Sequence, residues 1–119
     1  MKHNLLKKKS KKIRLDILNT IMNAGKGHIG GALSCVEILV TLYYCNILKF
    51  NRLKPKWKYR DRFIFSKGHA SIAHYVVLAD LNFFSKKELN YFNKPKGKIA
   101  EHPDTRLPGI ETVSGSLGH

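Results

Sequence analysis

The spacing of apolar residues in the first part of the chain predicts one long helix. Ile13, Ile17 and Ile21 recur at helical spacing, and the leucines and methionine beside them complete a single apolar stripe. We therefore expect a helix over residues 3–24, with the lysine run of residues 7–12 on its solvated face. Four glycines within residues 25–31 end this pattern and predict a flexible loop in which the backbone can approach a ligand closely.

A second helix is predicted to begin at Ser34, because Glu37 three residues later completes a capping box. Residues 36–48 are apolar almost all round, which indicates a buried helix, in part at a subunit contact. Cys35 and Cys45 are ten residues apart on it, or about 15 Å, which is too far for a disulfide between them. We interpret both as small core residues of a reduced, intracellular protein.

The next segment combines a strand signal with a turn and a helix. After a basic connection anchored on the core by Trp57, residues 63–65 are aromatic and β-branched, as in a buried strand. Residues 66–68 break the pattern, and residues 70–81 form an apolar helix. Because such a turn lies at the carboxyl end of its strand, where ligands bind in open α/β sheets, His69 is the strongest functional candidate.

The last third of the chain is less regular. Ser85 and Glu88 form a second capping box, which predicts a short helix ending near Phe92. From residue 93 onward, prolines and glycines predict a long loop, which in a compact domain is usually functional or a sign of a missing piece. Residues 115–119 are typical of the start of a further helix.

Composition and charge change this picture only a little. A chain of 119 residues with 43% apolar residues suits one globular domain. The net charge of +14 invites a nucleic-acid interpretation, but most of the excess is dispersed lysine without an aromatic platform or a recognisable motif. Solvated loops, or pairing with an acidic partner chain, explain it more simply. No apolar run is long enough to cross a bilayer and no signal peptide is present, so we expect a cytoplasmic protein.

Three histidines are the candidates for chemistry. His28, His69 and His102 each stand beside glycine or proline, and their wide separations do not match structural zinc sites. No serine stands in a nucleophile elbow. An anion site fits better, because imidazoles donate to phosphate or sugar hydroxyls and glycine turns offer free amides. Each histidine could also be an ordinary surface residue, and Lys67 could attract phosphate or simply be exposed.

Four blocks of sequence together resemble the transketolases in order and spacing. They are GHIGG at residues 27–31, DRFIFSKGHA at 61–70, EHP at 101–103 and LPGIETVSGSLG at 107–118. The resemblance runs from about residue 13 to the end, and it is closest to the N-terminal subunit of a split transketolase. It implies an α/β fold, namely a helix-rich, incomplete doubly wound parallel-sheet module of the thiamine-diphosphate-binding fold over residues 1–119.

The resemblance also implies a function. Transketolases use thiamine diphosphate and Mg²⁺ to move a two-carbon ketol unit between sugar phosphates, and they hold the cofactor between a diphosphate-binding and a pyrimidine-binding module. By position, His69 would line the cofactor and substrate site near the diphosphate. His28 and His102 would contact oxygens of the donor sugar and support proton transfers, so all three histidines are expected to be catalytic. A C-terminal, pyrimidine-binding chain is the implied partner, in a homo- or hetero-oligomer.

The end of the chain carries the remaining expectations. The backbone of Gly115 and Leu117, with Ser116 between them, would contact the aminopyrimidine of the cofactor. Glu101 stands where the family usually has glycine. The metal motif of the family would follow Gly118, so the ligands of Mg²⁺ are expected outside this chain, and the chain alone is expected to be inactive.

Two other classes of function stay open at this stage. One is a non-catalytic interaction protein that keeps the apolar helix of residues 36–48 as a dimerisation surface. The other, less favoured, is a basic nucleic-acid-binding module, whose affinity would fall steeply with added salt.

Overall fold

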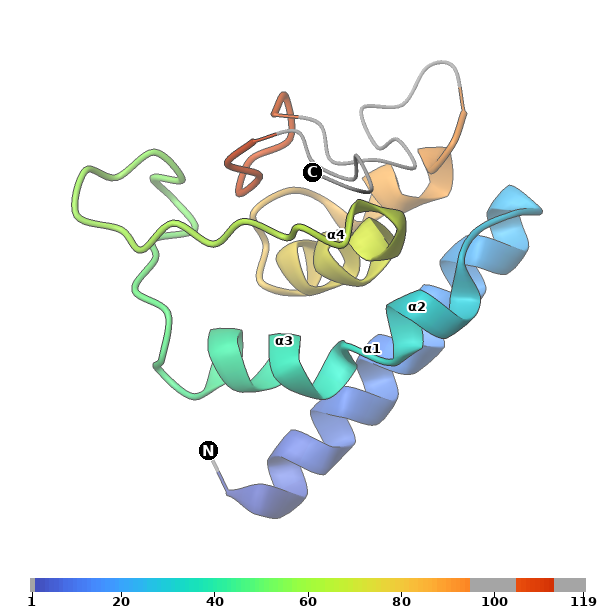
Figure 1. Cartoon of the computed structure of the whole chain (residues 1–119), viewed down its shortest axis with the longest axis horizontal. Helices are drawn as coiled ribbons and strands as arrows, with labels where there is room; N and C mark the ends of the chain where they lie inside the picture. Colours follow the sequence, from blue (N-terminus) through green and yellow to red (C-terminus); the bar gives the residue numbers. More distant parts are fainter. Residues whose placement is uncertain (1, 95–104, 113–119) are drawn as a thin grey trace.

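Helix α4 forms the centre of the molecule, and the other helices pack around it. The computed structural model describes residues 2–94 and 105–112, and in these it contains helices joined by irregular segments (Figure 1). The elements in order are α1 (His3–Ala24), α2 (Ile29–Leu33), α3 (Val36–Tyr44), the 3₁₀ turn η1 (Gly68–Ala70), α4 (Ser71–Asp80) and the 3₁₀ helix η2 (Lys86–Tyr91).

The core forms where α1 and α3 meet α4. Every residue of α4 from Ser71 to Ala79 is buried, and α1, α3 and α4 contact one another pairwise. The predicted stripe of α1 is confirmed, because Ile13, Ile17 and Ile21 are all buried in this core. Complete burial of one such side chain contributes about 1.5–3 kcal/mol, so this face holds α1 in place.

The glycine-rich stretch after α1 is shorter as a loop than predicted. Gly25 ends the helix as expected: its φ of 78° is left-handed, and its N–H donates to the carbonyls of Ile21 and Met22. The prediction of a loop as far as residue 31 is wrong, because α2 begins at Ile29. Two of the four glycines are therefore helical, which leaves a connection of only a few residues.

The predicted capping box of the second helix is also wrong. Ser34 has helical φ and ψ, and its hydroxyl donates back to the carbonyl of Gly31 at 2.9 Å, so it is not the N-cap. Cys35 occupies that position without a side-chain cap. Glu37 instead forms an ion pair with Arg14 of α1. The reason is that α2 runs almost directly into α3, which leaves no extended residue to cap.

Helix α3 is amphipathic in the structure rather than buried all round. Val36, Leu39, Val40 and Tyr43 face the core, whereas Ile38 is 62% exposed. The helix ends at Tyr44 instead of continuing to residue 48. Both cysteines are free, one at each end of α3.

The predicted strand of residues 63–65 is not found. The described residues contain no strand, and this segment is extended without a ladder partner among them. Its alternation is nevertheless that of a strand, because Phe63 and Phe65 pack against the core while Ile64 is 56% exposed. A strand needs a neighbouring strand to bond to, and within residues 2–94 and 105–112 none is present. The turn and the helix that follow agree with the prediction, since η1 leads into α4.

Two further contacts fix the segments around this extended stretch. Trp57 lies half-buried with its ring edge-on to Tyr59, outside the core cluster, so its predicted anchoring role is wrong. The anchor is Arg60, whose guanidinium donates twice to the carboxylate of Glu111 at 2.8 Å and once to the carbonyl of Trp57. Such a bidentate pair ties the segment of residues 105–112 to the stretch that leads to η1.

The second predicted cap is confirmed on its serine side. The hydroxyl of Ser85 accepts a hydrogen bond from the backbone N–H of Lys87 at 3.2 Å. The helix that follows, η2, is a 3₁₀ helix that ends at Tyr91, one residue before the predicted end.

Candidate functional site

His28 and His69 lie against each other although they are far apart in the sequence. Their ring centroids are 5.2 Å apart and the rings are nearly perpendicular, at 85°, so the contact is edge-to-face. His28 is the residue before α2, and His69 is the middle residue of η1. Since α2 and η1 pack together, the structure brings two of the predicted site histidines into one place.

Small residues allow this approach. Gly68 and Ala70, on either side of His69, are buried, and the N–H of Ala70 closes the turn by donating to the carbonyl of Lys67 at 3.0 Å. Before His28, a Cβ on Gly27 would lie 2.9 Å from the side chain of Ile21. A larger residue at Gly27 would therefore push the His28 loop away from α1.

Lys67 connects the two turns. Its ammonium group donates to the carbonyl of Gly31 at 3.3 Å and contacts the hydroxyl of Ser34 at 3.1 Å. A Cβ on Gly31 would lie 3.5 Å from the Lys67 side chain, an ordinary contact distance. The result is a small region with two imidazoles and one ammonium group, all carried on short turns.

This set of groups suits an anionic or hydroxylated ligand. Imidazole can donate or accept a hydrogen bond and can move a proton near neutral pH, and an ammonium group attracts phosphate oxygens. No metal cluster accompanies them: among the described residues, no group of three or more His, Cys, Asp or Glu side chains could hold a metal ion.

A third histidine, His74, is buried in the core one turn into α4. Its Nε2 is 2.7 Å from the hydroxyl of Tyr43, and its ring lies edge-on to Phe63 and Phe65. Burial lowers the pKa of His74 to about 3, so it is neutral at physiological pH. A histidine inside an apolar helical run is the sequence signal for such a position, and it marks a core residue rather than a ligand.

The other predicted site residues lie outside the described residues. They are His102, Gly115, Ser116 and Leu117, together with Glu101. Their predicted roles stay predictions.

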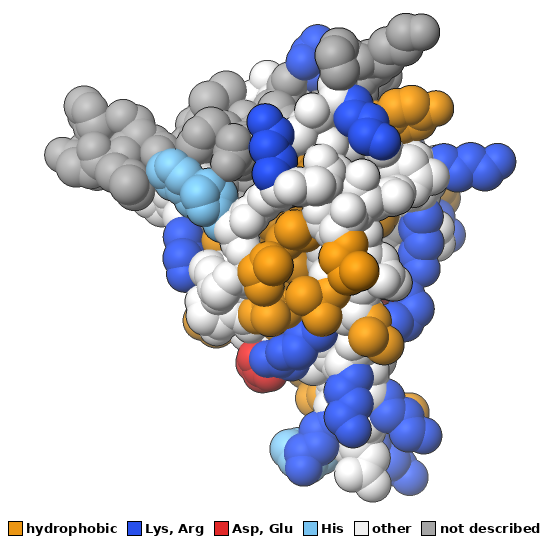
Figure 2. Space-filling model, turned by 90° about the vertical axis from the view of Figure 1, so that its right-hand side faces the viewer, with side chains coloured by type: hydrophobic (Ala, Val, Ile, Leu, Met, Phe, Trp, Pro, Cys, Tyr) orange, Lys and Arg blue, Asp and Glu red, His pale blue; other side chains and the backbone are white. Residues whose placement is uncertain are grey.

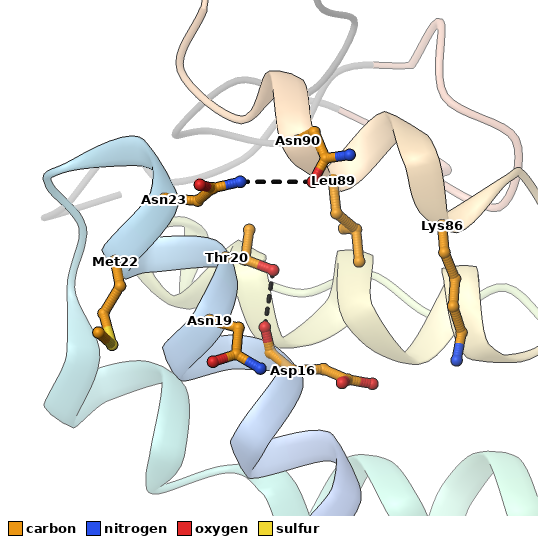
Figure 3. A pocket seen from close by; sticks show the side chains of 8 residues that line it. All are labelled: Asp16, Asn19, Thr20, Met22, Asn23, Lys86, Leu89 and Asn90. Atoms are coloured by element: carbon orange, nitrogen blue, oxygen red, sulfur yellow. Dashed lines mark hydrogen bonds between the residues drawn. The ribbon is translucent and has the colours of Figure 1, made fainter.

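The largest hollow on the described surface is elsewhere. It is a groove of about 600 Å³ between α1 and η2 (Figure 3). It is lined by Asp16, Asn19, Thr20, Met22, Asn23, Lys86, Leu89 and Asn90. Two hydrogen bonds occupy some of these groups: Thr20 donates to the carbonyl of Asp16, and Asn23 donates to Asn90. The lining contains no histidine, so the groove is not part of the His28–His69 site.

Comparison with known proteins gives this geometry a context. A family model described as the transketolase thiamine diphosphate binding domain matches residues 6–119. One of the two subunits named for the apulose-4-phosphate transketolase of Phocaeicola vulgatus is 38% identical over 119 residues, which is 100% of this chain and 42% of that protein. The 6-deoxy-6-sulfo-D-fructose transketolase subunit SqwG of a Clostridium species is 39% identical over 107 residues, 89% of this chain and 38% of that protein.

Solved structures agree. The transketolase of Campylobacter jejuni matches with a TM-score of 0.90 and 32% identity over 99% of this chain and 18% of its own. The transketolase of Leishmania mexicana matches with a TM-score of 0.89 and 26% identity over 95% of this chain and 17% of its own. The chain thus spans less than half of the length of each of these relatives. Likeness to transketolases is consistent with the α/β class for the family, while the described part of this chain is helical.

Proposed function

The chain belongs to the transketolase family, in its thiamine-diphosphate-binding domain, and we propose that it builds the first part of a diphosphate-binding module in an enzyme that transfers a two-carbon ketol unit between sugar phosphates. The observation that carries this proposal is the edge-to-face contact of His28 and His69. Two imidazoles at one point offer the hydrogen bonds and proton transfers that cleavage of a ketose requires near neutral pH.

The groups around the two histidines fit the proposed cofactor. A diphosphate needs hydrogen-bond donors and positive charge, and the imidazoles and the Lys67 ammonium group supply both. Thiamine diphosphate, when bound, supplies the stabilisation of a carbanion, which no side chain of this chain can provide. Ligands for Mg²⁺ are part of the proposal only outside the described residues, where the family's metal motif would follow Gly118.

Each histidine has a separate role in the proposal. His69 donates a hydrogen bond toward the diphosphate. His28 contacts an oxygen of the donor sugar and holds or accepts the proton of a reacting hydroxyl, a task in which His102 takes part. The loop of Gly115, Ser116 and Leu117 contacts the aminopyrimidine through its backbone.

The proposed partner is a second, pyrimidine-binding chain. The relatives from Phocaeicola and Clostridium are each named as subunits of a transketolase, and the chain covers less than half of either. We infer a homo- or hetero-oligomeric enzyme acting on sugar phosphates, with the cytoplasm as its place of work. The two free cysteines are compatible with that compartment.

Steady-state kinetics on the chain combined with a complementing C-terminal transketolase chain tests the proposal. His28→Gln and His69→Gln should each lower kcat/KM for ketol transfer by about 10²–10⁴-fold, the usual contribution of a proton-transferring group. His3→Gln, at the exposed start of α1, is the matched control and should leave the rate unchanged. Full activity in both site variants would contradict the proposal and favour a non-catalytic interaction protein.

A further inference from the structure

Lys67 differs from the other cations that the structure fixes in place. Those cations are paired with carboxylates: Lys9, Lys12 and Lys86 with Asp80, Arg14 with Glu37, and Arg60 with Glu111. Both hydrogen-bond partners that the structure gives to Lys67 are neutral, namely the Gly31 carbonyl and the Ser34 hydroxyl. Its positive charge is thus held in position without being neutralised by either partner.

The position of this charge is defined by the two turns that carry the histidines. Gly31 and Ser34 belong to the α2 region that follows His28, and Lys67 is two residues before His69. Lys67 is exposed, so the ammonium group reaches solvent while its hydrogen bonds fix its direction. An ammonium group has three N–H donors, and two contacts leave one donor for a ligand.

We propose that Lys67 binds a phosphoryl group of a ligand that occupies the His28–His69 site. This inference rests on the proposed function and goes beyond it, because it assigns a residue to the charge of the ligand rather than to its reaction. An exposed lysine normally costs side-chain entropy when a ligand orders it. Here the contacts to Gly31 and Ser34 have already ordered the side chain, which favours binding.

Two sources could bring that phosphoryl group to Lys67: the diphosphate of the cofactor and the phosphate of the sugar. They share one chemistry, an anionic oxygen that accepts a charged hydrogen bond. The test therefore has one arm for each source.

The variants are Lys67→Met, which keeps most of the length of the side chain and removes its charge, Lys67→Arg, which keeps the charge, and Lys87→Met as a control at an exposed position on η2. Each is assembled with a complementing transketolase chain. The first arm is calorimetric titration with thiamine diphosphate, and with inorganic pyrophosphate as a probe of the diphosphate alone. The second arm compares KM for a phosphorylated and an unphosphorylated ketose.

Lys67→Met should weaken one class of phosphorylated ligand by about 10- to 100-fold, as expected for the loss of a charged hydrogen bond. The arm in which this happens identifies the source. Lys67→Arg should recover most of the affinity, and Lys87→Met should have none of the effect. KM for the unphosphorylated ketose should not change in any variant.

Two results would overturn the inference, and they are distinguishable. If the wild-type assembly binds thiamine diphosphate and turns over but Lys67→Met matches it in both arms, Lys67 only connects the two turns, and the proposed function stands. If the wild-type assembly binds neither phosphorylated ligand, the proposed function fails and the inference fails with it.

Discussion

His74 is the residue whose ionisation the fold controls most strongly. It is 2% exposed, it pairs with Tyr43 through Nε2, and its ring is surrounded by phenylalanines. The same burial raises the pKa of Tyr43, so both groups stay neutral across the physiological range. In the unfolded chain a histidine titrates near pH 6.5, whereas in the folded chain burial lowers its pKa to about 3.

The direction of the resulting pH dependence follows from these two values. Below pH 6.5 the unfolded state binds a proton that folded His74 does not, so the free energy of unfolding falls as the pH drops, until the folded residue also titrates near pH 3. His74→Gln should be less stable than the wild type at about pH 7.5 but should lose less stability between roughly pH 6.5 and 5. The difference in slope should approach about 1.4 kcal/mol per pH unit, the value for one proton.

Denaturant unfolding of the assembled protein at a series of pH values measures this slope. His3→Gln, which replaces an exposed histidine at the start of α1, should keep the wild-type slope. Parallel curves for the wild type and His74→Gln would show that His74 is protonated in the folded state and would contradict its assignment as a neutral core residue.

At the scale of the residue, sequence predicted the identity of the site better than its geometry. Glycine neighbours and the family motifs selected His28 and His69 among six histidines. Their contact depends on α2 packing against η1, a long-range event that no local pattern contains. The tether from Lys67 to Gly31 and Ser34 was missed for the same reason.

Asp80 connects more elements than any other charged residue described. It ends α4, and its carboxylate accepts hydrogen bonds from Lys9 and Lys12 of α1, at 2.9 and 2.6 Å, and from Tyr44 of α3. Lys86 of η2 is 3.5 Å away. Burial alone would raise the pKa of Asp80, but the hydrogen bonds from Lys12, Lys9 and Tyr44 lower it well below its usual range.

Asp80→Asn should therefore destabilise the fold by about 2–3 kcal/mol, because it removes charged hydrogen bonds and leaves neighbouring lysines without their counter-charge. The control is Asp16→Asn, which breaks only the i,i+4 pair with Lys12 on the surface of α1 and should cost about 0.5 kcal/mol or less. Denaturant midpoints at neutral pH measure both values. Equal, small losses would contradict the role of Asp80 as the junction between helices.

At the scale of the element, patterns of burial were more informative than capping motifs. The long apolar repeat predicted α1 almost to the residue, and the glycine at its end fixed its boundary. The Ser34–Glu37 motif failed because Glu37 found a partner in α1, Arg14, which sequence spacing cannot show. The strand over residues 63–65 failed as a ladder although its alternation is present, because pairing is a property of two strands.

The whole molecule presents a cationic surface interrupted by apolar side chains. The chain carries a net charge of +14, and Figure 2 shows hydrophobic side chains gathered on one face with lysines and arginines around them. Apolar residues on α1, α2 and α3 are among those left exposed, for example Leu15, Ile29 and Ile38. None of the described helices is both long and apolar enough to span a membrane. This surface is compatible with the partner chain of the proposed enzyme.

One measurement tests the account most directly: calorimetric titration of thiamine diphosphate with Mg²⁺ into this chain, into a complementing C-terminal transketolase chain, and into their mixture. The account predicts saturable binding only in the mixture, weakened at least tenfold by His69→Gln, roughly the effect of losing a hydrogen bond to a charged group, and unchanged by His3→Gln. A mixture that forms a complex but binds no thiamine diphosphate would contradict it. The His28–His69 pair would then be a structural contact, and the chain an interaction protein of the transketolase family.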